Sequence, residues 1–323
     1  MSKFSDLGNA LYSGERSYDF IGKRKVFYGI AGVMVVLSFI LPFLLHSGFN
    51  FGIEFKGGSE FRVAGVAAQS QSIATDAVHA VVPEAEATVT KVGTDSIRVQ
   101  TRQLQDEVSE EVRQALADAY DVPAASVASS FVGPNWGADV TGKALSGLVT
   151  FVVLAAILMA LYFRTAKMSI AAVAALLHDL IITAGVYGTL GFEVTPAAVI
   201  GFLTILGYSL YDTVVVFDKI RENTFEVEFS EKSTFAGQVN LAINQTLVRS
   251  VNTSVVAVLP VAAILFIGAT LLGAGTLRDI SLALFIGIVI GTYSTIFIAA
   301  PLYSHLREGE AKYAKAAAKI KAS

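Results

Sequence analysis

Four long stretches of the chain contain no lysine, arginine, aspartate or glutamate. They cover residues 26–53, 144–163, 250–277 and 280–304. Each is at least as long as the roughly 20 apolar residues with which a helix crosses about 30 Å of hydrocarbon. Two further apolar runs, 168–192 and 194–217, are interrupted only by a histidine and two aspartates. The pattern therefore predicts six membrane-spanning helices.

The distribution of basic residues predicts how these helices are oriented. We place the spans at residues 26–46, 143–163, 169–190, 195–218, 244–268 and 279–304. Basic residues gather in segments 1–25, 219–243 and 305–323 and in the turn between the second and third spans, whereas turns 191–195 and 273–279 hold at most one. The positive-inside rule then places both termini in the cytoplasm. The first span is too long for a signal-peptide core and lacks a small-x-small cleavage site, so we interpret it as an uncleaved anchor.

Residues 47–142 separate the first two spans on the extracytoplasmic side. Patterns typical of strands and helices alternate along this segment. They predict a strand at 51–63 that is interrupted by Gly57-Gly58, a helix at 69–82, strands at 87–92 and 96–101, a helix at 104–120 and a strand at 126–132. This βαββαβ order predicts a ferredoxin-like sandwich. The predicted fold class is thus a membrane all-α six-helix bundle with a small α+β ferredoxin-like extracytoplasmic domain between helices 1 and 2.

The composition agrees with a chain that has lipid as a second solvent. Charged residues make up 16% of the 323 residues, and mean hydropathy is +0.60; ordinary soluble domains carry about 25% charged residues. The net charge of −3 gives no indication of a nucleic-acid partner. The chain has no cysteine, P-loop, HExxH or Gly-x-Ser-x-Gly sequence, and its four histidines are scattered. We therefore expect no enzymatic activity, no organic cofactor and no metal site.

Asp212 is the clearest candidate for chemistry inside a span, because burying an ionisable group in a membrane costs on the order of several kcal/mol. It precedes Arg221 by nine residues, which places it about 13 Å inside the cytoplasmic boundary. Arg249 begins the uncharged run of the fifth span at a compatible depth, and we predict it to be the compensating cation. The pair predicts a proton-conducting site. The alternative is a static ion pair that fixes helix packing.

Other polar residues of the spans are candidates for a proton relay. His178 and Asp179 are adjacent in the third span, and a histidine beside an intramembrane carboxylate can pass protons. A hydrogen-bonded packing pair is the alternative. Asn252 and Thr253 lie on the same polar stripe as Arg249 at helical spacings of three and four.

Charged residues near the ends of the spans have a simpler interpretation. We expect Asp218 to end the fourth span at the membrane interface. We expect Glu193 and the Arg278–Asp279 pair to be solvated in extracytoplasmic turns. A GxxxG sequence at 287–291 in the sixth span predicts close helix approach.

Five segments, in order along the chain, resemble the SecF members of the SecD/SecF protein-export family. They are FNFGIEFKGG at 49–58, FVGP at 131–134, HDLIIT at 178–183, GYSLYDTVVVFDKIREN at 207–223 and NQTLVRS at 244–250. One departure is Tyr211, where the family most often has asparagine before the aspartate. The resemblance covers about residues 20 to 305 and leaves out the lysine-rich tail, for which we expect contact with anionic lipid.

The resemblance implies one half of an RND-superfamily transporter in the bacterial inner membrane, paired with SecD and associated with the SecYEG channel and YajC. It implies that the proton motive force promotes preprotein translocation, with Asp212 and Arg249 as the conduction site and residues 47–142 in contact with unfolded preprotein. The alternatives are a half-size RND-type exporter of lipids or small molecules, a non-transporting membrane scaffold, and the paralogue SecD, whose outer domain is normally much longer.

Overall fold

The computed structural model describes residues 3–46, 48–66, 70–93, 95–225, 233–268 and 275–322. Residues 226–232 of the predicted connection 219–243 lie outside this set, as does the start of the predicted turn 273–279.

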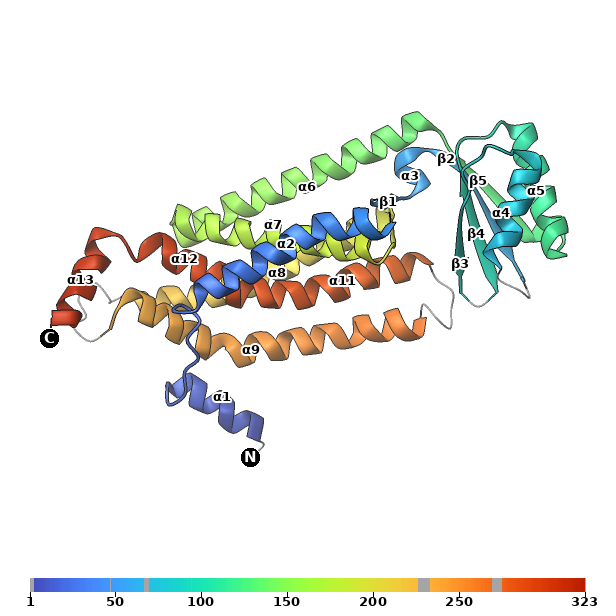
Figure 1. Cartoon of the computed structure of the whole chain (residues 1–323). Helices are drawn as coiled ribbons and strands as arrows, with labels where there is room; N and C mark the ends of the chain where they lie inside the picture. The colour runs from blue at the N-terminus through green and yellow to red at the C-terminus, as the bar shows by residue number, and fades with distance from the viewer. Residues whose placement is uncertain are drawn as a thin grey trace.

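Six helices in the described part of the chain are long and apolar enough to cross a membrane, as the hydropathy pattern predicts. They are α2 (Arg24–His46), α6 (Pro134–Phe163), α7 (Ala166–Thr189), α8 (Pro196–Thr224), α9 (Phe235–Ala263) with the π-helical turn η3 (Ile264–Gly268), and α11 (Gly275–Ser294) with the π-helical turn η4 (Thr295–Ala299) and α12 (Ala300–Arg307). The helices run alongside one another as a bundle (Figure 1). The chain is therefore a multi-pass membrane protein.

Helices α7, α8 and α11 form the interior of the bundle. About half of their apolar stretches is buried, whereas at most 17% is buried in α2, α6 and α9. Small residues bring α8 and α11 together, because a side chain at Gly201 would overlap Ala283 and one at Gly287 would overlap Ile205. The GxxxG sequence at 287–291 therefore packs against α8.

The two ends of the bundle differ. An α/β domain lies at one end, and both chain termini lie at the other, which we call the terminal end (Figure 1). Two further helices, α1 (Lys3–Ser13) and α13 (Ala311–Ala322), lie at the terminal end. Tyr313 of α13 stacks on Phe235 at the start of α9, with ring centroids 4.3 Å apart.

The α/β domain is a four-stranded antiparallel sheet with helices on one face. Its elements in chain order are β2 (Gly58–Ala64), α4 (Gln71–Val81), β3 (Thr88–Val92), β4 (Ser96–Thr101), α5 (Asp106–Tyr120), the 3₁₀ turn η1 (Ala124–Ser126) and β5 (Val127–Val132). The strands are arranged in the order β3-β4-β2-β5. Phe61, Val99 and Leu116 are fully buried between sheet and helices. Arg98 and Gln100 alternate with the buried positions of β4, so the opposite face of the sheet is polar.

The predicted strand 51–63 is wrong in its first half. The chain instead forms the short strand β1 (Asn50–Phe51), a single helical turn α3 (Ile53–Lys56) and then β2. The predicted interruption at Gly57 and Gly58 is confirmed, since their φ angles of 77° and 146° are rarely adopted by other residues. β1 pairs in parallel with β6 (Glu193–Val194), the turn between α7 and α8. The segment after α2 is therefore tied to the α7–α8 connection.

Candidate functional site

Asp212 lies near the middle of α8 and is buried, with 6% of its surface exposed. Its Oδ1 accepts a 2.8 Å hydrogen bond from the hydroxyl of Ser250 on α9. Its Oδ2 has no hydrogen-bond partner among the described residues. The carboxyl group can therefore take up a proton on its open oxygen and still keep the contact with Ser250.

Arg249 is the residue before Ser250, but its guanidinium does not form a direct ion pair with Asp212 in the described structure. The direct partner is Ser250, which the sequence argument missed. Its position beside Arg249 in the NQTLVRS segment was the signal that could have found it.

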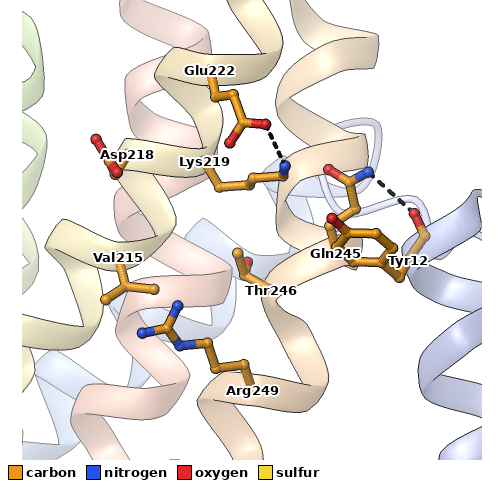
Figure 2. Close-up of a pocket in the computed structure, with 8 residues that line it drawn as sticks. All are labelled: Tyr12, Val215, Asp218, Lys219, Glu222, Gln245, Thr246 and Arg249. Atoms are coloured by element: carbon orange, nitrogen blue, oxygen red, sulfur yellow. Dashed lines mark hydrogen bonds and ion pairs between the residues drawn. The ribbon is translucent and has the colours of Figure 1, made fainter.

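The Arg249 side chain lies in a cavity of about 270 Å³ at the terminal end of α8 and α9 (Figure 2). The lining residues come from α1, α8 and α9: Tyr12, Val215, Asp218, Lys219, Glu222, Gln245, Thr246 and Arg249. Lys219 pairs with Glu222 at 2.8 Å. Val215 follows Asp212 by three residues on α8, so the cavity ends about one helical turn from the buried carboxylate. Charged groups therefore extend from the terminal end almost to Asp212.

Asp179 on α7 is a second buried carboxylate, and it joins three helices. Its Oδ2 accepts hydrogen bonds from Ser209 on α8 at 2.6 Å and from Ser294 on α11 at 2.8 Å. Its Oδ1 lies 3.2 Å from Nδ1 of the adjacent His178. No hydrogen bond connects this cluster with the Asp212 carboxylate among the residues described. The structure therefore places the two predicted groups in separate networks one turn apart on α8.

The remaining relay candidates lie toward the surface of the bundle. Asn252 is exposed on α9, and Thr253 is half-buried. Helix α8 also exposes Gly207 and Tyr211, and the same stripe continues into the cavity at Val215. Asn252 on α9 and Gly207 and Tyr211 on α8 are thus exposed within the membrane-crossing part.

Glu193 is buried, which contradicts the expectation that it is solvated. Only 7% of its surface is exposed. Arg98 of β4 donates a hydrogen bond to its Oε2, and Gln100 of β4 donates one to its Oε1 at 2.7 Å. Burial raises the pKa of Glu193, against the opposing effect of Arg98 and Gln100. The contact joins residues more than 90 positions apart in the chain, so the sequence carried no local signal for it.

The other charged residues expected in turns and at the interface differ in their surroundings. Asp279 is half-buried and accepts a 2.9 Å hydrogen bond from the hydroxyl of Thr195, so the expectation that it is solvated is also wrong. Arg278 is exposed and lies over the ring of Phe192, 4.9 Å from its centroid. Asp218 is exposed at the edge of the cavity.

These features define a class of protein: a multi-pass membrane subunit whose helix bundle buries ionisable groups and whose α/β domain projects from one end. Comparison with known families identifies the class more closely. The model described as protein export membrane protein SecD/SecF, C-terminal, matches residues 111–309, and the SecD/SecF GG motif matches residues 43–64. The chain belongs to the SecD/SecF family of protein-export membrane proteins, which confirms the resemblance found in the sequence.

Individual relatives agree with this assignment. The chain is 45% identical over 314 residues to protein translocase subunit SecF of Streptomyces coelicolor, covering 96% of this chain and 82% of the relative. It is 42% identical to SecF of Mycobacterium tuberculosis H37Rv, covering 92% and 69%. The crystal structure of SecDF from Thermus thermophilus matches with a TM-score of 0.76 and 30% identity over 91% of this chain. This chain spans 39% of that longer SecDF chain.

Proposed function

We propose that this chain is the SecF subunit of a SecD–SecF pair and uses the proton motive force to promote preprotein translocation through a SecYEG channel. The observation that carries the proposal is the buried Asp212 carboxylate, which holds one hydrogen bond from Ser250 and ends next to a charged cavity. One charge crossing 100 mV releases about 2.3 kcal/mol. That free energy shifts a two-state equilibrium about fiftyfold.

Arg249 acts in this proposal as a movable counter-charge. Because no direct ion pair with a described residue holds it, the guanidinium can approach Asp212 when the acid is ionised and withdraw into the cavity when the acid is protonated. This arrangement favours conduction over a static bridge. His178 and Asp179 act as a relay through Ser209, one turn before Asp212.

The bundle is proposed to lie in the bacterial inner membrane with both termini in the cytoplasm, as the basic residues of the terminal segments favour. The α/β domain then lies outside the cell membrane, where it contacts unfolded preprotein. Its strand order supports the finer assignment to the ferredoxin-like class. The cavity around Arg249 becomes the cytoplasmic exit for protons. Coupling requires no organic cofactor or metal, and the chain has no enzymatic activity of its own.

The proposed partner SecD covers the polar faces of α8 and α9. Polar groups facing lipid are costly, and small residues such as Gly207 let a second helix approach closely. Asn252 and Thr253 then lie on the partner-facing side of the proton path. The likeness to the fused SecDF chain supports this pairing. The pair associates with SecYEG and YajC. The lysine-rich tail contacts anionic lipid.

The test replaces Asp212 by asparagine in membrane vesicles that contain SecD and the channel. Asparagine keeps an oxygen for the Ser250 hydroxyl but cannot ionise, so helix packing is retained and proton exchange is lost. We expect the stimulation of export by a proton gradient to disappear while SecD still co-purifies. Asp139→Asn, at an exposed acid on α6 outside the cavity, is the control and should export normally. Wild-type export by Asp212→Asn would refute conduction at this site.

A further inference from the structure

The contact between the α/β domain and the bundle is built around one buried acid. Glu193 lies between the last turn of α7 and the start of α8, and its two carboxylate oxygens are bound by two side chains of β4. Gln100 uses its amide nitrogen twice, donating to Glu193 at 2.7 Å and to Glu60 of β2 at 3.0 Å. Arg98 and Gln100 belong to the polar face of the sheet, opposite its helices. The sheet therefore meets the bundle through that polar face.

The same short segment is linked to the inner helices. Val194 accepts a 3.0 Å hydrogen bond from the backbone of Gly52, next to the parallel β1–β6 pair. Thr195 accepts a hydrogen bond from the Ala198 amide at the start of α8 and donates one to Asp279 of α11. A displacement of α7, α8 or α11 therefore reaches Glu193 without passing through a flexible connection.

We propose that Glu193 is the positioning residue through which movement of α7 and α8 reaches the α/β domain. It acts on β4 through the hydrogen bonds that Arg98 and Gln100 donate to it. The inference rests on the proposed export function and adds the link between bundle and domain. Glu193 suits this task because it is held from two directions and shielded from water, so the contact is stiff. Two directional hydrogen bonds, one of them from a guanidinium, fix the register and orientation of the two surfaces.

The test uses the absence of cysteine from the chain. Cysteines replace Gln100 and Glu193, and a short bifunctional thiol reagent with a reducible bond joins them in vesicles containing the complete complex. We expect that the two substitutions lower gradient-stimulated export, because they break the contact between β4 and Glu193, and that cross-linking restores it, because the covalent link again couples the domain to the bundle. Reduction removes the link but leaves both substitutions, so a renewed loss of export isolates the effect of the link itself.

The matched control joins Gln100 to Glu60, its register partner on β2, within the sheet. This pair shares one substituted position and places the link inside the domain, so linking it should leave export unchanged. The proposal is overturned if the 100–193 link does not restore export, if that pair fails to cross-link where the 60–100 pair succeeds, or if both links change export alike. Charge exchange adds a second readout: Glu193→Arg combined with Arg98→Glu should restore more export than either single change. Normal export by Asp212→Asn would instead refute the proton mechanism.

Discussion

Replacing Arg98 by alanine should loosen the α/β domain from the bundle far more than its surface position suggests. The Glu193 side chain is 6% exposed and would keep only Gln100 as its partner. Breaking a buried ion pair in this way costs about 3–5 kcal/mol. We expect the lower end, about 3 kcal/mol, because a quarter of the Arg98 side chain is exposed and part of the bridge is already solvated. This value corresponds to roughly a hundredfold weaker docking.

The loss of docking affinity in Arg98→Ala should depend on pH in a defined direction. The charged groups facing Glu193 are Arg98 from β4, Glu60 from β2 and Glu54 from α3. The pKa of Glu193 is raised by burial, and removing Arg98 raises it further. An acid whose native pKa lies above its unfolded value is destabilising when ionised, and this penalty disappears as pH falls toward the unfolded value. Acidification therefore reduces the loss of docking affinity that Arg98→Ala causes, while it weakens the ion pair between Arg98 and Glu193 in the wild type.

Hydrogen exchange of the Gly52 amide measures this docking directly, because that amide donates to Val194 beside Glu193. Arg98→Ala should lower its protection by about two orders of magnitude at neutral pH. Arg62→Ala is the matched control, since Arg62 is the register partner of Arg98 on β2 and is exposed. Equal protection in both variants, or a deficit that does not change with pH, would show that Glu193 does not hold the domain.

Four further substitutions test the packing. Gly287→Val should lower the stability of the purified chain in thermal unfolding by about 1–3 kcal/mol, because the new side chain would overlap α8. Gly207→Val, at an open position, should leave that stability unchanged and weaken co-purification with SecD. Ser294→Ala removes one of two hydroxyl donors to Asp179 and should cost about 1.5–3 kcal/mol in denaturant unfolding. Leu116→Ala should cost about 2–5 kcal/mol and appear as early melting of the α/β domain alone by circular dichroism.

The sequence predicts the membrane architecture well because lipid imposes a strong and local requirement. An uncharged run of sufficient length is by itself enough to indicate a spanning helix, and the six runs correspond to six helices. The alternation of strands and helices in residues 47–142 could likewise be predicted, except for the helical turn before Gly57. There the chain turns because two glycines adopt positive φ angles, and two glycines inside a strand pattern do not reveal whether the strand bends or ends.

The contacts of the charged residues were harder to predict, because they depend on which helix faces which. Charge alone paired Asp212 with Arg249, but a helix turns about 100° per residue, and it is Ser250 that faces the acid. Glu193 was assigned to a solvated turn since short loops are usually exposed. Its burial arises from β4, a strand that the chain reaches far earlier. A single sequence contains nothing that links these two positions.

Hydrogen bonds fasten the inner helices of the bundle to one another at two levels, and in the proposed mechanism this lets one proton move the α/β domain. Asp179 binds α7, α8 and α11 together near the middle of the bundle, and Thr195 and Asp279 bind α8 and α11 again near Glu193. Helix α9 is hydrogen-bonded to this group through Ser250 at Asp212 and Ser254 at Thr292. Changing the charge of Asp212 therefore acts at the junction between α8 and α9. In the proposed mechanism the fastened helices respond as a unit, and Glu193 carries their displacement to the α/β domain.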